Sequence, residues 1–303
     1  MSEIFNLLLL QNTLRTSTPV VLCALGCLMT DQAGFMNIGV DGMMLMGAFF
    51  AVLGSYLFAS WAMGLVFALV LGIGLGYFYY LFSVRLKSDE FIIGVALNIL
   101  AGGLTVFLLR TLFGVKGSFS GPGIVPLPTL RIPWLEQIPV LGPILSGNTL
   151  LVYASWLLVL LCWVLLYRTP LGFHLRASGE APEALRASGK SPERMKRLAS
   201  VLCGALATLS GAHLSLGYLT MFSENMSASR GYVAVACVIF GGGNPPRVFL
   251  AALLFGFIDA LGMRLQKYIP SDLTSTAPYL VTVVMMVAVV LLRRRRQARQ
   301  AGL

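Results

Sequence analysis

The chain has 303 residues, of which 57% are hydrophobic and only 11% charged, and its mean hydropathy is +0.83. Soluble domains carry roughly 25% charged residues, so this composition excludes a soluble globular protein and indicates an integral membrane protein. The net charge of +10 does not indicate a nucleic-acid partner, because seven of the 22 basic residues lie in 168–197 and five in 293–299, beside apolar runs.

Apolar runs long enough to cross a hydrocarbon core, about 20 residues for roughly 30 Å, recur along the chain. They lie near residues 17–29, 37–60, 61–84, 91–113, 149–167, 198–219, 231–242, 246–265 and 277–292. The first and the seventh are too short to span comfortably. The runs also lack the alternation of β-barrel strands. We therefore predict one all-α transmembrane domain over 1–303, a polytopic bundle of about 8–10 membrane segments with short or broken helices.

Polar residues interrupt the N-terminal apolar stretch, namely Asn6, Gln11, Asn12 and Arg15. No cleavable signal peptide is evident, and we expect residues 4–15 to lie along the membrane surface. The five cysteines lie within or beside apolar runs, and an odd number cannot pair completely. No disulfide framework is therefore expected.

Polar side chains inside the spans are candidate pathway residues, because a charge at mid-bilayer costs about 2.5–3.5 kcal/mol. They are Asp41, Asn98 and Asp259, with Asn37, Glu224 and Asn225 at the expected span ends. Asn37 and Asp41 share a helix face, among glycines that permit a broken helix lining a cavity. Asp41 could equally cap or pair with a neighbouring polar group. Asn98 could bind a substrate hydroxyl or simply join helices.

The basic residues also predict which loops face the cytoplasm. Arg85 and Lys87 mark a short cytoplasmic loop, and the two runs that follow bring residues 168–197 back to the same side. The intervening stretch 114–148 is rich in Pro and Gly, carries few charges and is expected outside, as an extracytoplasmic loop. The basic tail, 293–303, is expected in the cytoplasm, where membrane lipid is a sufficient partner.

Residues 168–197, the polar segment, carry signals for two helices of their own. Pro182 followed by good helix formers, with Gly189 after them, predicts a short helix of about two turns. Ser191, Pro192 and Glu193 then supply an N-cap, a first-turn proline and an acid at the positive end of the next helix. A capped helix between two spans fits a docking site for another protein, and an ordinary solvated loop is the alternative.

The remaining polar and aromatic residues allow more than one interpretation. Five polar residues expected at the outer end could serve gating or protein contact, or form a solvated loop: Glu224, Asn225, Ser227, Ser229 and Arg230. Seven aromatic residues could stack on a flat base, although such residues usually serve packing: Phe35, Phe49, Phe50, Phe91, Tyr218, Phe222 and Tyr232. Neither His174 nor His213 has ligands at metal-site spacing, and no catalytic triad is recognisable, so no metal site and no enzyme are expected.

Four segments resemble a known family. Gly179–Gly189 (GEAPEALRASG) resembles the coupling loop of ABC-importer permeases, in the branch that serves nucleosides, simple sugars and branched-chain amino acids. Gly34–Ala48 is similar to that branch's N-I-G-x-E-G-M-M-L-x-G-A segment, with Asp41 where Glu is usual. Phe222–Tyr232, continuing to Gly241, is similar to nucleoside permeases in particular, and Asp89–Gly94 with Asn98 adds a fourth match. The resemblance covers about Thr13 to Gln266.

The resemblance implies a transmembrane subunit of an ATP-driven nucleoside importer in the bacterial cytoplasmic (inner) membrane. Its partners would be a cytoplasmic ABC ATPase, a second homologous permease and an extracytoplasmic substrate-binding protein. This chain has no G-x-x-x-x-G-K-S/T phosphate loop, so we expect it to bind no cofactor, and ATP and Mg²⁺ to be used by the ATPase.

The resemblance also implies two sets of site residues. The coupling set comprises Glu180, Pro182, Glu183, Ala184, Leu185, Arg186, Ser188 and Gly189. The substrate-pathway set comprises Asn37, Asp41, Phe91, Asn98, Phe222, Glu224, Asn225 and Ser229. Alternatives are a simple-sugar or branched-chain amino acid permease, or an ATP-independent secondary transporter. A secondary transporter is expected to carry titratable or ion-coordinating residues along its path, and Asp41 and Asp259 are the candidates for that role.

Overall fold

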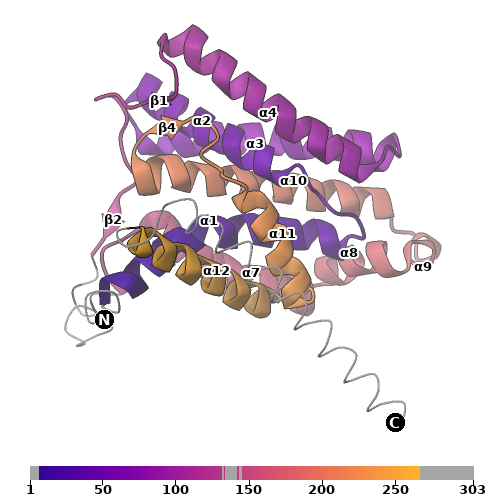
Figure 1. The fold of residues 1–303 in the computed structure, drawn as a ribbon. Coiled ribbons are helices and arrows are strands. Elements are labelled where there is room, and N and C mark those ends of the chain that lie inside the picture. Colours follow the sequence, from indigo (N-terminus) through magenta and orange to yellow (C-terminus); the bar gives the residue numbers. More distant parts are fainter. Residues whose placement is uncertain (1–6, 132, 134–141, 143–144, 267–303) are drawn as a thin grey trace.

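The computed structural model of the chain describes residues 7–131, 133, 142 and 145–266, and long helices dominate it (Figure 1). Its first half holds α1 (Leu7–Gln32), α2 (Val40–Phe58), α3 (Trp61–Tyr80) with the π-helical turn η1 (Leu81–Arg85), α4 (Glu90–Phe113), β1 (Ser118–Phe119) and β2 (Thr129–Leu130). The second half holds β3 (Asn148–Thr149), α7 (Leu150–Arg168), α8 (Pro170–Glu180), α9 (Pro182–Ala187), α10 (Pro192–Ala212) with the π-helical stretch η2 (His213–Leu219), β4 (Phe222–Ser223), α11 (Arg230–Gly241) and α12 (Pro245–Leu265).

Within these residues, seven helices are long and apolar enough to cross a membrane, and α11, with 12 residues, is a shorter apolar helix. This confirms the predicted polytopic helical bundle. The only β-structure in the same residues is two antiparallel two-stranded pairs, β1 with β4 and β2 with β3. The β1–β4 pair connects the 114–131 stretch to a segment about a hundred residues later, whereas β2 and β3 lie close together in the chain.

Local sequence signals explain several helix boundaries. Asp89 begins α4, because its carboxylate accepts hydrogen bonds from the backbone N–H groups of Phe91 and Ile92 at 2.9 and 3.0 Å. Gly114 ends the same helix with φ of 68°, a left-handed conformation that glycine adopts without strain. In α8, Pro170 occupies the first turn and Thr169 caps it by accepting from the N–H of Gly172.

Three helices form the centre of the bundle. In the most apolar stretch of α1, 89% of residues are buried, and in α2 and the α10–η2 helix 72%, against 28% in α3, α4 and α7. Glycines bring the central helices close, as small residues do where membrane helices pack. A Cβ at Gly47 of α2 would overlap the backbone of Thr208, and one at Gly211 of α10 would overlap the carbonyl oxygen of Met44.

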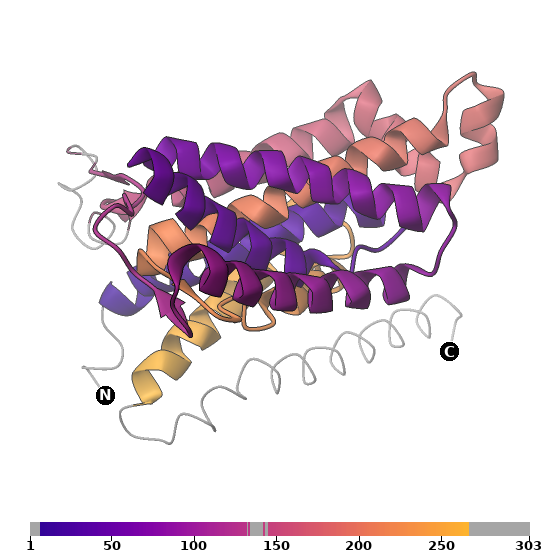
Figure 2. The same ribbon diagram turned by 90° about the horizontal axis from the view of Figure 1, so that it is seen from above.

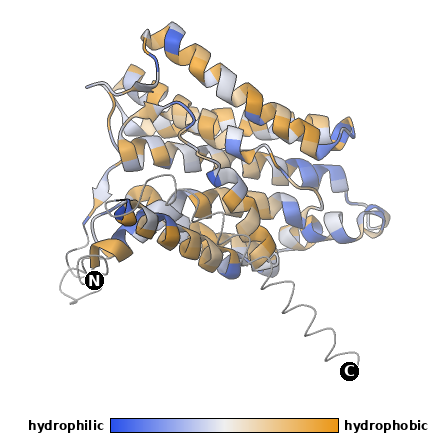
Figure 3. Cartoon of the chain, viewed as in Figure 1, coloured by the Kyte–Doolittle hydropathy of each residue, from blue (hydrophilic) through white to orange (hydrophobic). Residues whose placement is uncertain are grey.

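The bundle has two distinct ends. At one end, residues from 83–91 and 182–196 line a common cavity, so the loop of Lys87 and the polar segment are at the same end of the bundle, as the prediction that they face the same side requires. Hydrophilic residues gather there around α8 and α9 (Figure 3), and α9 extends past the neighbouring helices (Figure 2). At the opposite end, Gln11 and Arg15 of α1 donate to the carbonyl oxygens of Ser146 and Gly147. We call these the polar-segment end and the loop end.

The expectation for the N-terminus was wrong over the residues that the structure describes. Residues 7–15 are not a separate surface segment but the first turns of α1. Thr13 donates to the carbonyl oxygen of Leu9 one turn earlier in the helix. Arg15 reaches Gly147 and Asn148, partners that the local sequence does not reveal. The predicted span 277–292, the basic tail and part of the 114–148 loop lie outside the described residues.

Candidate functional site

Two non-helical segments enter the bundle and stop at the starts of α2 and α11. Residues 33–39 precede α2, and residues 224–229 precede α11. Asn225, Ala228 and Ser229 take positive φ values of 55°, 45° and 61°, which turn the second segment back into the bundle. Irregular backbone inside a membrane protein is stable only where it is buried in protein or lines a cavity. The starts of α2 and α11 therefore mark a candidate site.

Asp41 joins these two helix starts. Its Oδ1 accepts a hydrogen bond from the backbone N–H of Gly231 at 3.0 Å, and its Oδ2 accepts one from the Ser227 hydroxyl at 3.1 Å. The residue lies in the first turn of α2, while Gly231 lies in the first turn of α11. A Cβ at Gly231 would lie 2.5 Å from the Cα of Asp41, so glycine permits this approach. The geometry supports the capping interpretation of Asp41.

Asn98 ties α4 to the same place. Its Oδ1 accepts from the backbone N–H of Gly42 at 2.7 Å, and its Nδ2 donates to the carbonyl oxygen of Ile38 at 3.1 Å and to the Tyr232 hydroxyl at 2.8 Å. Both amide hydrogens are thus used within the bundle. Asn98 joins three segments, as the helix-joining interpretation requires.

An ion pair lies on the other side of the α11 start. The Arg230 Nη2 is 3.1 Å from Oδ2 of Asp259 in α12, and the two side chains are 21% and 29% exposed. Asp259 is about 21 Å along α12 from Pro245, at a rise of about 1.5 Å per residue. Since the hydroxyl of Tyr167, near the end of α7, donates to the carbonyl oxygen of Gly243, α12 begins at the polar-segment end. The pair therefore lies inside the span, about two-thirds of the way along α12.

Two predicted pathway residues are packed in the interior. Asn37 is fully buried, its Oδ1 accepting from the N–H of Gly39 at 3.0 Å and its Nδ2 lying 3.4 Å from the Cys203 Sγ. Phe222 is also fully buried, with its ring edge-to-face on Phe49 at 5.2 Å between centroids. Their contacts are those of core residues, and a part in the pathway stays a prediction.

The other predicted pathway residues lie at different depths. Glu224 is at the loop end, where its Oε1 accepts from the N–H of Gly117 at 3.0 Å. Ser229 is the N-cap of α11 without a side-chain cap bond, and exposed Phe91 lines the cavity at the polar-segment end. The expected outer cluster is therefore divided, because Ser227 and Arg230 turn inward to Asp41 and Asp259. Local sequence could not show this, because both carboxylate partners belong to distant helices.

The polar segment folds as predicted and is braced by ion pairs. Helix α9 spans Pro182–Ala187, Gly189 has φ of 78°, and Ser191 accepts from the N–H of Arg194 at the start of α10. Arg186 pairs with Glu193 at 2.6 Å and with Glu183 at 2.7 Å. The hydrogen bond that Arg186 donates to the Glu193 carboxylate, together with the negative charge of Glu183, raises the pKa of the Arg186 guanidinium.

The predicted coupling residues divide into exposed and anchored positions. Glu183, Ala184, Arg186, Ser188 and Gly189 are exposed, with the Glu183 side chain 82% exposed. Leu185 is only 3% exposed and holds α9 to the bundle. One face of α9 is thus free for a partner protein, while the opposite face is fixed to this chain.

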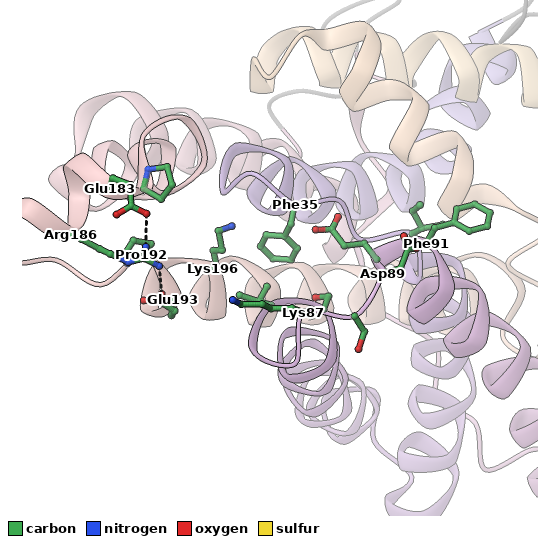
Figure 4. Close-up of a pocket in the computed structure, with 15 residues that line it drawn as sticks. Phe35, Lys87, Asp89, Phe91, Glu183, Arg186, Pro192, Glu193 and Lys196 are labelled. Carbon is green, nitrogen blue, oxygen red and sulfur yellow. Dashed lines mark hydrogen bonds and ion pairs between the residues drawn. The ribbon is translucent and has the colours of Figure 1, made fainter.

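Two cavities flank α9. One of about 820 Å³ lies between the loop before α4 and the α9–α10 region, with Phe35, Lys87 and Lys196 among its lining residues (Figure 4). The other, about 480 Å³, lies between α8 and α9 and is lined by Phe173, Arg176, Glu180, Ala184 and Ser188, among others. Helix α9 therefore lies between two cavities at the polar-segment end.

The polar segment contacts the site inside the span through residues 33–39. A Cβ at Gly179 of α8 would lie 2.7 Å from both the Gln32 carbonyl oxygen and the Gly34 nitrogen, so the two backbones touch. The carboxylate of Glu90 accepts from the Met36 N–H at 2.7 Å. A displacement of α8 and α9 would therefore also displace residues 33–39, which precede Asp41 in the chain.

Long apolar helices, two helix starts that meet inside the span and a capped polar segment at one end define a multi-pass membrane transport component. The chain belongs to the family described as branched-chain amino acid transport system / permease component, which matches residues 9–290. It is thus an ABC permease.

Relatives within this class differ in the substrates for which they are named. A putative glucose ABC transporter permease protein of Haloferax volcanii is 33% identical, over 86% of this chain and 78% of its own length. A guanosine ABC transporter permease protein of Bacillus subtilis is 30% identical, over 90% of this chain and 88% of its own. A nucleoside ABC transporter permease protein of Lactococcus lactis is 29% identical, over 91% and 90%. No solved structure matches this chain.

Proposed function

We propose that this chain is the transmembrane subunit of an ATP-driven importer and forms half of a translocation pathway for nucleosides. The observation that carries the proposal is the similarity to guanosine and nucleoside permeases over about nine-tenths of the chain. The complex resides in a bacterial cytoplasmic membrane, with the polar-segment end in the cytoplasm.

A cytoplasmic ABC ATPase docks on the exposed face of α9 and uses ATP and Mg²⁺. The exposed positions of Glu183, Ala184 and Ser188 and the cavities on either side of α9 support this docking. The buried Leu185 side chain fixes α9 to the rest of the chain, and Arg186 pairs with Glu193 of α10, so a displacement of α9 would also displace its neighbours.

Transport follows from alternating access. A binding protein delivers the substrate at the loop end, where Glu224 and the β1–β4 pair lie. Closure of the ATPase moves α8 and α9, and the Gly179–Gly34 contact passes this movement to the start of α2. There Asp41 and Asn98 couple α2, α4 and α11, so the helix starts move together. A second, homologous permease completes the pathway.

The second candidate function within the class is sugar import, which the glucose permease relative supports. Uptake of labelled guanosine, glucose and leucine into proteoliposomes that hold the complete complex distinguishes the candidates. Guanosine uptake that excess glucose and leucine do not reduce is the expected result. Glucose or leucine uptake without guanosine uptake would refute the nucleoside assignment.

A further inference from the structure

Tyr232 presents a hydroxyl with an unused proton at the surface of the bundle. The oxygen accepts a hydrogen bond from the Nδ2 of Asn98 at 2.8 Å, and the residue is 43% exposed. Among the hydrogen bonds of the described residues, none has the Tyr232 hydroxyl as its donor. This side chain therefore offers one donor and one exposed aromatic face.

The hydroxyl lies within the depth of the membrane. Its partner Asn98 is about 12 Å along α4 from Glu90, which is at the polar-segment end, at a rise of about 1.5 Å per residue. Tyr232 itself is in the first turn of α11, which has 12 residues and ends near the start of α12. A hydrocarbon core is roughly 30 Å thick, so a group at this position cannot reach interfacial water along the lipid surface.

Lipid is an unfavourable neighbour for this part of the surface. A hydroxyl donor without an acceptor in an apolar environment costs about 1–3 kcal/mol on protein mutational scales. Two residues earlier, Arg230 pairs with Asp259, which places two partly exposed charges inside the span as well. Side chains of this kind within a membrane face a bundle interior or a water-filled cavity. The start of α11, between α4 and α12 in Figure 1, is therefore a surface for water or substrate.

We propose that Tyr232 contacts the substrate in the pathway, and the proposal rests on the function proposed above. Its hydroxyl donates a hydrogen bond to an acceptor of the passing nucleoside, and its ring packs against the flat base. Asn98 is a positioning residue, because its Nδ2 holds the phenol oxygen while its other groups bind Ile38 and Gly42. This bond leaves the phenol proton directed away from Asn98.

Substitution by phenylalanine removes only the hydroxyl. We expect Tyr232→Phe to lower ATP-driven nucleoside uptake roughly two- to tenfold, the effect of losing one hydrogen bond in the pathway. Tyr77→Phe is the matched control, since Tyr77 is 44% exposed on α3 and its hydroxyl makes no hydrogen bond to the described residues. Equal uptake by the two variants would overturn the proposal. Absence of nucleoside uptake by the wild-type complex would instead refute the proposed function.

A second experiment separates substrate contact from a structural role. All five native cysteines are buried, so a new thiol can be modified selectively. We expect Tyr232→Cys to react with a water-soluble methanethiosulfonate reagent, more slowly when guanosine is present. Val70→Cys, at a 65% exposed position on α3, should not react. A Tyr232→Cys variant that stays unmodified, or that guanosine does not protect, would contradict the assignment.

Discussion

Replacing Asp41 with alanine removes both oxygens that join the starts of α2 and α11. The Gly231 N–H and the Ser227 hydroxyl, 3.0 and 3.1 Å from those oxygens, would lose their acceptor inside the bundle. Each buried donor left without a partner costs about 1–3 kcal/mol, so the loss of folding free energy should be about 2–6 kcal/mol. Asp41→Asn is the matched variant. Its amide oxygen still accepts from Gly231 and its NH₂ can donate to the serine oxygen, so the loss should stay below about 1.5 kcal/mol.

Thermal unfolding of the complex in lipid nanodiscs measures the difference. The alanine variant should unfold several degrees below the wild type, while the asparagine variant should unfold near it and retain nucleoside uptake. An alanine variant that unfolded like the wild type but took up no substrate would contradict this role, because Asp41 would then act on the substrate. Loss of uptake in a stable asparagine variant would show that transport needs the charge itself, as ion coupling would.

Three further outcomes separate coupling from packing. Glu183→Arg, at an 82% exposed position, should abolish ATP-driven uptake with little change in unfolding temperature. Leu185→Asp should also unfold the polar segment, because Leu185 is 3% exposed. If neither variant uncoupled uptake from ATP hydrolysis, α9 would not be the docking site. Gly72→Ala in α3 should impair folding, because the new Cβ would meet Gly204 and Thr208 of α10. Gly74→Ala on the same helix meets nothing within 4 Å and should be neutral. Equal yields of folded protein from the two variants would contradict the close packing of α3 on α10. Phe222→Ala should destabilise the protein by about 3–5 kcal/mol in thermal unfolding, and wild-type stability would show that its ring is not a core residue.

The short elements were predictable because their signals are local. Pro182, Gly189 and the Ser191–Pro192 pair define the ends of α9 and the start of α10 through backbone chemistry within a few residues. The short apolar run 231–242 likewise became a helix too short to span, α11. A family resemblance then added the partners, which no local pattern contains.

Contacts between distant segments could not be predicted in this way. Arg15 is accommodated in α1 because Gly147 accepts its hydrogen bond, and the pairing of Asn98 with Tyr232 joins residues 134 positions apart. The inward turn that takes Arg230 to Asp259 depends on left-handed residues, Asn225, Ala228 and Ser229, whose conformations side-chain chemistry alone does not specify. The predicted pathway residues consequently lie at the loop end (Glu224), within the span (Asp41 and Asn98) and at the polar-segment end (Phe91), and do not line one continuous surface.

Reconstitution with defined components tests directly whether ATP hydrolysis on another chain moves these helices. Proteoliposomes are prepared with this chain, its partner permease and the ATPase, with loaded binding protein outside, enclosed ATP and Mg²⁺, and no ion gradient. We predict nucleoside uptake that stops when either the ATPase or ATP is omitted. Uptake by this chain alone, driven by an ion gradient in the absence of ATP, would contradict the account.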